Sequence, residues 1–327
     1  MRRREFIKLI GGTAAAWSTF ASAQQNIPRI GILWHGANEE EEAIYLGAVR
    51  QGLGDFGYVE GKNIILENRF PAEIPDRFIS LAADLAALHV DVLVAINLAA
   101  GLAAQRATMT IPVIFVAVPD PVGAKLVASL AHPGGNITGL SNFAHDLTGK
   151  RVEYLKQIVP SVSRIALLVN PSNKASSETY IEEAQKAADK LGLALYPVEV
   201  HSRSDLAPAF EKMQDQKIDG VVVSQDGLFF VSRKEIAELA LARGLPSAVY
   251  SRETVEAGAL ASYGPDNYGI FRRSGYYIDN ILKGAKPADL PVEQPTKFEF
   301  IINRKTAKTL GLTISQTMLV AADDIVQ

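Results

Sequence analysis

Residues 91–118, DVLVAINLAAGLAAQRATMTIPVIFVAV, contain two apolar runs separated by an alanine-rich segment. The runs Asp91 to Ile96 and Val113 to Val118 are short and apolar throughout, which predicts two buried strands. The segment that starts at about Ala99 predicts a helix between them. Strands that are apolar on both faces are typical of parallel sheets covered by helices on each side. This stretch therefore predicts a strand–helix–strand unit of an α/β fold.

The same alternation extends to both sides of this unit. Connections between parallel strands of one sheet are right-handed, which favours a doubly wound topology. The elements expected in the first part of the chain are strands at 29–34 and 63–69, helices at 40–56 and 78–88, and a short helix at 124–130.

A second series of strands and helices begins after the glycine-rich turn Pro133–Asn136 and the short run 137–140. Two successive series of similar length predict two similar lobes. The elements expected in the second series are helices at 147–158, 178–191, 205–216 and 234–243, and strands at 164–169, 194–200, 220–224 and 247–250.

The last part of the chain predicts a tail that returns to each lobe in turn. It has a strand at 259–263, a helix at 268–282, a proline-rich connector, a strand at 298–302 and a short helix at 306–310. Several crossings between two lobes make a hinge, and a hinge makes a cleft. We expect an α/β fold of two doubly wound parallel-sheet lobes joined by a hinge. Residues 27–142 plus 260–288 form the first lobe, and residues 143–259 plus 289–327 form the second.

The first 23 residues have a different composition and predict an export signal. A basic start with Arg2, Arg3, Arg4 and Lys8 precedes a soft apolar run, and small residues end it at Ala21-Ser22-Ala23, which predicts cleavage after Ala23 and a periplasmic location. Arg3-Arg4 with the following Phe and Lys also resembles the twin-arginine signal; an ordinary secretory signal is the alternative.

Composition excludes several classes of protein. The chain has 327 residues, 33 Lys and Arg, 36 Asp and Glu, a net charge of −3 and no cysteine. A near-neutral charge gives no footprint for nucleic acid. The absence of cysteine excludes disulfides, thiolate metal sites and a cysteine nucleophile. Without residues 1–23 the remaining 304 residues carry a net charge of −6.

Motifs of catalysis and of cofactor binding are missing from the sequence. It has no G-x-S-x-G elbow, no H-E-x-x-H and no phosphate-binding loop, and its five histidines lack metal-ligand spacing. We therefore expect no cofactor and no metal site. The acidic run Glu39–Glu42 is interpreted as a solvated helix start, where acids suit the helix dipole.

Ligands of open parallel sheets bind at the carboxyl ends of the strands. The candidate ligand-binding residues are those that follow the predicted strands, together with the residue at the lobe junction: Trp34, His35, Asn97, Leu98, Asp120, Asn142, Asn170, Gln225, Asp226, Tyr250, Tyr263 and Asp266. Each one has another interpretation. Asn97 and Asp226 could cap the helices that follow them, and Asp120 precedes a proline in a turn.

The chemistry of these residues suggests an amino acid or a related small molecule. Asp226 could pair with an ammonium group, while a ligand carboxylate would rest on helix N-termini. Aromatic side chains could hold an apolar or aromatic group, or could instead be core and hinge packing: Trp34, Phe143, Phe229, Phe230, Tyr250 and Tyr263. The alternatives for the cleft are an exported enzyme acting through Asp120, Asp226 or His35, and a ligand-sensing domain.

Several ordered stretches resemble the family of ABC transporter substrate-binding proteins that includes tryptophan-binding proteins. The most distinctive is SLAHPGGNITGL at 129–140. The others are 51–53, 57–63, 110–113, 120–123, 281–293 and 303–312. The pocket segments 97–100 and 225–230 do not match the tryptophan-binding members.

The resemblance implies a type I periplasmic-binding fold with three hinge crossings. It implies a protein that captures a small molecule outside the inner membrane and delivers it to the membrane permease of an ABC transporter. We expect a monomer that is not an enzyme.

Overall fold

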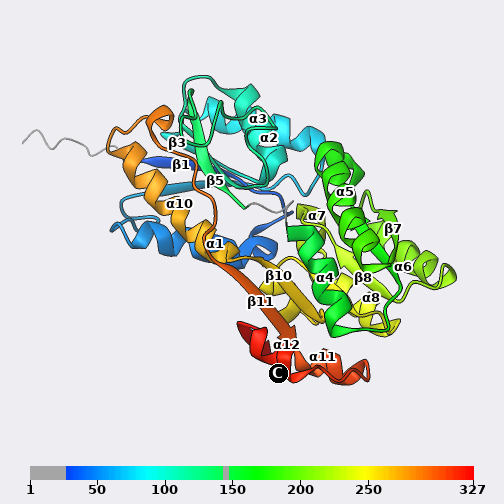
Figure 1. Cartoon of the computed structure of the whole chain (residues 1–327). Coiled ribbons are helices and arrows are strands. Elements are labelled where there is room, and N and C mark those ends of the chain that lie inside the picture. The colour runs from blue at the N-terminus through cyan, green and yellow to red at the C-terminus, as the bar shows by residue number, and fades with distance from the viewer. Residues whose placement is uncertain (1–26, 143–146) are drawn as a thin grey trace, which may run out of the picture.

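The protein has two α/β lobes, each built on its own sheet (Figure 1). The structure is a computed structural model and describes residues 27–142 and 147–327, so the signal predicted at 1–23 and Phe143 lie outside the described residues. One sheet has five strands in the order β2-β1-β3-β4-β5, and the other has seven in the order β12-β11-β10-β9-β8-β6-β7. The predicted fold class of two doubly wound lobes is confirmed.

The first lobe contains five parallel strands and the helices between them. Its strands are β1 (Arg29–Leu33), β2 (Ile65–Arg69), β3 (Val92–Ile96), β4 (Val113–Val118) and β5 (Ile137–Ser141). Its helices are α1 (Glu39–Gly54), α2 (Pro75–Ala87), α3 (Asn97–Ala107) and the late helix α10 (Asn267–Leu282).

The second lobe contains the remaining elements. Its strands are β6 (Arg164–Val169), β7 (Ala194–Glu199), β8 (Gly220–Val223), β9 (Ser247–Val249), β10 (Ala261–Pro265), β11 (Phe298–Asn303) and β12 (Asp324–Val326). Its helices are α4 (Thr148–Ile158), α5 (Lys174–Leu191), α6 (Leu206–Asp215), α7 (Gly227–Val231), α8 (Arg233–Ala242), α9 (Arg252–Glu256), α11 (Arg304–Thr309) and α12 (Gln316–Ala321).

Helices cover both faces of each sheet, as apolar parallel strands require. In the first lobe α1 packs with α10, and α2 packs with α3 on the other face. In the second lobe α4 packs with α5, and α6 packs with α8 on the other face. The cluster of buried side chains that contains Ile30 of β1 also contains Phe210 of α6, so the apolar core is continuous from one lobe to the other.

Helices α1 and α10 approach closely because both carry a glycine at the crossing. A Cβ atom at Gly52 would lie 1.9 Å from the carbonyl oxygen of Arg272, and a Cβ atom at Gly275 would lie 2.3 Å from the carbonyl group of Gly52. Only a residue without a side chain leaves room for this contact. The close crossing attaches α10, which comes late in the sequence, to α1, which comes early in the first lobe.

One pair of strands departs from the parallel arrangement. Strand β11 runs antiparallel to β10, with partners from Ala261 and Ile302 to Pro265 and Phe298. The reason is the route of the chain, which leaves the second lobe after β10, forms α10 on the first lobe and comes back from there. Strand β12 then pairs parallel to β11 at the edge of the sheet.

The positions of two crossings differ from the expected boundaries. The chain was expected to return to the first lobe at residue 260. Strand β10 instead pairs with β9 and β11 in the second sheet, so the crossing lies at Asp266. The chain was expected to return to the second lobe at residue 289. However, the N–H of Val292 donates to the carbonyl of Leu130, and the N–H of Glu293 donates to the carbonyl of Gly139, both in the first lobe. This crossing therefore lies between Glu293 and Phe298. The remaining crossing joins β5 to α4.

The short helix predicted at 124–130 does not form, and this segment consists of turns and bends. Asp120 starts the turns by accepting a hydrogen bond from the N–H of Gly123 at 2.8 Å. The N–H groups of Leu126 and Val127 both point to the carbonyl of Pro121, whereas a helix would pair each with a different carbonyl.

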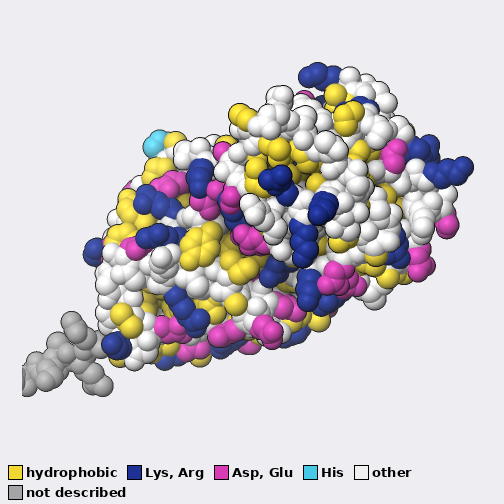
Figure 2. All heavy atoms as spheres, turned by 90° about the horizontal axis from the view of Figure 1, so that it is seen from below, with side chains coloured by type: hydrophobic (Ala, Val, Ile, Leu, Met, Phe, Trp, Pro, Cys, Tyr) yellow, Lys and Arg dark blue, Asp and Glu magenta, His cyan; other side chains and the backbone are white. Residues whose placement is uncertain are grey.

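Charged side chains of both signs are interspersed over the face shown in Figure 2. This mixture matches the small net charge of −3. Among the described residues, no helix is both long enough and apolar enough to span a bilayer.

Candidate functional site

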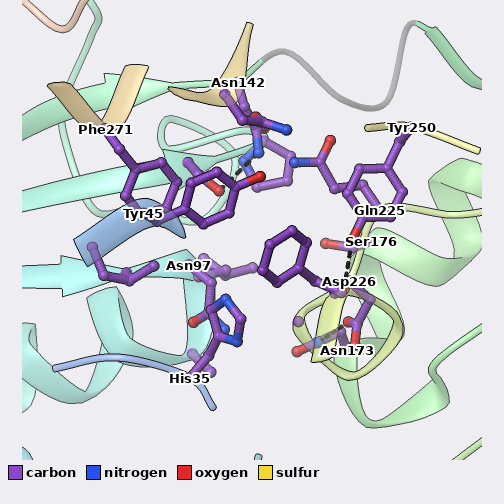
Figure 3. A pocket seen from close by; sticks show the side chains of 18 residues that line it. His35, Tyr45, Asn97, Asn142, Asn173, Ser176, Gln225, Asp226, Tyr250 and Phe271 are labelled. Atoms are coloured by element: carbon purple, nitrogen blue, oxygen red, sulfur yellow. Dashed lines mark hydrogen bonds between the residues drawn. The ribbon is translucent and has the colours of Figure 1, made fainter. Parts of the chain in front are cut away.

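A pocket lies between the two lobes, at the carboxyl ends of the strands (Figure 3). First-lobe residues line one side of it, and residues around α5, β8 and β9 line the other. The side chains that line it are His35, Tyr45, Ile96, Asn97, Leu98, Ala99, Ala117, Pro119, Asn142, Asn173, Ser176, Gln225, Asp226, Gly227, Phe230, Tyr250, Asn267 and Phe271.

Seven of the residues selected from the sequence line this pocket. They follow β1, β3, β5, β8 and β9, whose carboxyl ends meet at the cleft. These residues are His35, Asn97, Leu98, Asn142, Gln225, Asp226 and Tyr250.

The five other selected residues do not line the pocket. Trp34 is buried and donates its indole N–H to Asn68 at 2.8 Å. Asp120 caps the turn described above, and Asp266 caps α10 by accepting from the N–H of Gly269 at 2.9 Å. Tyr263 packs against Tyr154, with ring centroids 5.1 Å apart. Asn170 does not line the pocket, but it donates a hydrogen bond to Asp226, which does.

Asp226 combines the two roles that the sequence left open. It caps α7, because its Oδ1 accepts from the N–H of Leu228 at 3.0 Å. It also lines the pocket, where Asn170 donates to Oδ1 at 2.9 Å and Asn173 donates to Oδ2 at 2.6 Å. Burial raises the pKa of this carboxyl group, although the three hydrogen bonds favour the ionised form. The carboxylate is thus held in one orientation toward the pocket.

Three amide oxygens of the lining are buried without a hydrogen-bond partner: Asn142 Oδ1, Gln225 Oε1 and Asn267 Oδ1. The orientation of Asn142 is fixed, because its Nδ2 donates to the carbonyl of Ala117 at 2.9 Å and leaves Oδ1 as the acceptor. Buried acceptors of this kind are rare unless they have a function. The lining contains no lysine or arginine among the described residues. The pocket is therefore suited to a ligand that donates hydrogen bonds.

Donors are supplied to the pocket by the start of α3 and by the hydroxyl group of Ser176. Asn97 begins α3 with a positive φ of 77° and caps it by accepting from the N–H of Ala100 at 3.0 Å. The next residues, Leu98 and Ala99, line the pocket in the first turn of α3, and Ser176 lines it in the first turn of α5. Backbone N–H groups in the first turn of α3 have no partner within the helix, so they can bind an anionic group. Helix α5 continues directly from a 3-10 turn at Pro171–Asn173 and offers no such free start.

Four aromatic rings form a stacked column beside the pocket, here called the aromatic column: Trp34, Phe271, Tyr45 and Phe230. The ring centroids of Phe271 and Tyr45 are 4.1 Å apart, and those of Tyr45 and Phe230 are 4.7 Å apart. Phe230 belongs to the second lobe and the other three rings to the first. The column therefore connects the lobes.

A buried acid, Glu42, and a partly buried one, Glu73, lie behind His35. Its Nδ1 is 3.2 Å from Glu42 Oε1 and 3.4 Å from Glu73 Oε1. Glu42 is 0% exposed, so the run Glu39–Glu42 is not entirely the solvated helix start that was expected. Glu42 also accepts from the N–H of Gly36 at 2.6 Å, which explains its burial. Burial, Asp226 and Glu42 together raise the pKa of Glu73 well above its ordinary value.

Sequence reasoning missed several residues of the lining. Tyr45 and Phe271 lie on helices, away from strand ends, and α10 reaches the pocket only by returning from late in the chain. Asn267 directly follows the selected Asp266 after β10. Asn173 and Ser176 stand just after the selected Asn170, so a wider window after each strand would have found them. In residues 27–142 and 147–327 no group of three or more acidic or histidine side chains is arranged to hold a metal ion.

Comparison with known proteins places these features in a family. The model of the family described as "ABC transporter substrate binding protein" matches residues 37–326. A tyrosine-binding protein of Clostridioides difficile is 28% identical over 294 residues, which are 90% of this chain and 83% of that protein.

Of two similar solved structures, one contains a bound ligand and the other is ligand-free. An ABC domain from Streptococcus pneumoniae in complex with L-Trp is 30% identical, with a TM-score of 0.83 over 91% of this chain and 99% of that one. A ligand-free, open substrate binding protein from Clostridium difficile is 25% identical, with a TM-score of 0.65 over 92% of this chain and 99% of that one. The TM-score is higher against the L-Trp complex than against the ligand-free, open structure. The relatives are solute-binding proteins and not enzymes.

Proposed function

The chain belongs to the family of ABC transporter substrate-binding proteins, and from that membership we propose that it captures an α-amino acid, or a close relative of one, between its lobes. In this function the ammonium group of the ligand contacts Asp226 and the unpartnered amide oxygens of Asn142, Gln225 and Asn267. The ligand carboxylate contacts the first turn of α3 and the hydroxyl group of Ser176. His35, Asn97, Leu98 and Tyr250 complete the walls.

The observation that carries the proposal is that two kinds of polar group line one pocket. The acceptors are the carboxylate of Asp226 and three unpartnered amide oxygens, and the donors include the first-turn N–H groups of α3 beside Leu98. An ammonium group can donate three hydrogen bonds and a carboxylate can only accept them. A zwitterion therefore satisfies both sets, whereas a neutral sugar would leave the carboxylate of Asp226 without a cation. Relatives that bind tyrosine and L-Trp support the same chemical class.

The test is the substitution Asp226→Asn, measured first with the twenty common L-amino acids by thermal shift and then by calorimetry. Asparagine keeps the shape but removes the charge, and a charge-assisted hydrogen bond contributes about 1.5–3 kcal/mol. Affinity for the best amino acid should fall more than about tenfold.

Asp266→Asn is the matched control for this substitution. Asp266 also follows a strand and also caps a helix, but it lies outside the pocket lining. The control should bind with unchanged affinity. If no amino acid raises the melting temperature of the wild-type protein, or if Asp226→Asn binds as well as Asp266→Asn, the proposal is wrong.

We also propose that the protein is exported to the periplasm by the twin-arginine route, loses residues 1–23, and delivers its ligand to the permease of an ABC importer as a monomer. The basic start and the small residues before the predicted cleavage point support export. The double substitution of Arg3 and Arg4 by lysine should leave the precursor in the cytoplasm. Normal processing of that variant would instead identify an ordinary secretory signal.

A further inference from the structure

Both faces of Tyr45 are covered by rings of the same chain. Phe271 covers one face at a centroid distance of 4.1 Å and an interplanar angle of 8°. Phe230 covers the other at 4.7 Å and 19°. Another ring could enter between two stacked rings only if their separation grew to about 7 Å, twice the contact distance of carbon atoms. No aromatic group of a ligand can stack on Tyr45 while Phe230 stays in this position.

Phe230 is itself held in place from several sides. The guanidinium carbon of Arg233 lies 4.4 Å from the ring centroid, and Arg233 Nη1 donates to the carbonyl oxygen of Phe230 at 2.9 Å. The ring of His35 meets the Phe230 ring edge-on at 5.9 Å. The side chain of Phe230 is 3% exposed. These contacts favour the ring position seen here over one turned away from the cleft.

The space that remains in the pocket is small. Its cavity volume is about 70 Å³. A buried cavity of about 150 Å³ is known to bind benzene, so the remaining space is roughly half of what one aromatic ring requires.

We propose that Phe230 sets the upper size limit of the ligand, so that this cleft takes amino acids with small side chains and excludes the aromatic ones. The inference rests on the proposed function and adds the substrate class to it. In this arrangement Phe230 takes the position beside Tyr45 that the ring of an aromatic ligand would need. The relatives that bind tyrosine and L-Trp do not define the ligand of this chain.

The experiment compares wild-type protein with Phe230→Ala and Phe230→Leu by titration calorimetry. The ligands are glycine, L-alanine, L-serine, L-phenylalanine, L-tyrosine and L-tryptophan. For the wild type, the best of the three small ligands should bind at least tenfold more tightly than any of the aromatic ones. Removal of the Phe230 ring should lower the Kd of at least one aromatic amino acid tenfold or more.

Phe229→Leu is the matched control for Phe230→Leu. Phe229 belongs to the same helix and is equally buried, but it does not line the pocket. It should leave the order of the six affinities unchanged. The wild-type measurement needs no variant, so it decides the question even if Phe230→Ala fails to fold.

Two failures are distinguishable. If the wild type binds an aromatic amino acid more tightly than the small ones, or if both Phe230 variants leave all three aromatic Kd values within twofold of wild type, the size limit is wrong while the proposed function stands. If none of the twenty common amino acids binds to the wild type or to the Phe230 variants, the proposed function and this inference are both overturned.

Discussion

Glu73 brings a carboxylate from the first lobe to the second. A Cβ atom at Gly227 would lie 1.8 Å from Glu73 Oε1, so the carboxylate fits only because position 227 has no side chain. Burial and the charges of Asp226 and Glu42 raise its pKa well above 4.5. An acid with a raised native pKa holds its proton more tightly in the folded protein than in the unfolded chain.

The substitution Glu73→Gln should therefore stabilise the protein at high pH. In the wild type, the free energy of unfolding falls as pH rises from about 4.5 through the raised native pKa. Each unit of pKa difference lowers it by about 1.4 kcal/mol. Glutamine stays neutral, so its melting temperature should exceed that of wild type at pH 8 and equal it at pH 4.

The exposed Glu40, on the same lobe, provides the control Glu40→Gln. It should change the melting temperature little at either pH. A Glu73→Gln variant that is less stable than wild type at pH 8 would show that the ionised Glu73 makes favourable interactions that outweigh the cost of its burial.

At the scale of elements, the crossing of α1 and α10 makes a sharp comparison possible within one helix. Gly52→Ala places a Cβ atom against the carbonyl oxygen of Arg272, whereas Gly54→Ala meets no atom within 4 Å. Overpacking costs about 1–3 kcal/mol. An alanine at the open position of a helix stabilises by about 0.4–1 kcal/mol.

Chemical denaturation should thus give opposite signs for the two alanine variants, with Gly52→Ala less stable than wild type and Gly54→Ala slightly more stable. Equal effects would mean that the helices separate at little cost and that α10 is not tightly fixed to the first lobe.

Most elements could be predicted because their apolar patterns are strong. The stretch 91–118 predicted β3, α3 and β4, and the second lobe followed the same logic. The segment 124–130 misled because Leu126 and Val127 are buried in turns, and burial alone does not determine a helix. The partners of β10 could not be predicted, because the apolar pattern of residues 259–263 indicates a strand but not the sheet in which it pairs.

The pocket could be predicted where local position determines it. His35, Asn142 and Asp226 follow strands, and the ends of parallel strands meet in space. Trp34 directly precedes His35 and lies in the aromatic column instead, because successive side chains of an extended segment point to opposite sides. Phe271 depends on a tertiary contact between α10 and α1, which sequence spacing does not encode.

At the scale of the whole molecule, the aromatic column supplies a reporter of the lobe arrangement. The chain has 2 tryptophans, Trp17 and Trp34, and the first belongs to the predicted signal. In a protein of residues 24–327, Trp34 is the single tryptophan and stands in the column that ends on Phe230 of the other lobe. If a ligand shifts the lobe equilibrium, this column is expected to change.

Addition of the amino acid identified by thermal shift should change the tryptophan emission in a saturable way, with the same Kd as calorimetry. Trp34→Phe should abolish the signal and keep most of the affinity, since Trp34 does not line the pocket. Binding by calorimetry with no change in emission would mean that the ligand enters without altering the column.

The antiparallel pair β10 and β11 has a mechanical consequence. The chain leaves for the first lobe after β10 and returns from it before β11, so both crossings lie at the same end of this strand pair. The N–H of Asp266 donates to the carbonyl of Lys297 at 3.2 Å, just beyond the last paired residues. The β10–β11 pair can bend as a unit without loss of its hydrogen bonds, whereas sliding of one strand along the other would break them. The two chain crossings that meet at Asp266 and Lys297 are therefore tied to each other where they leave the sheet. When the lobes move relative to each other, we expect these two crossings to bend together as one unit.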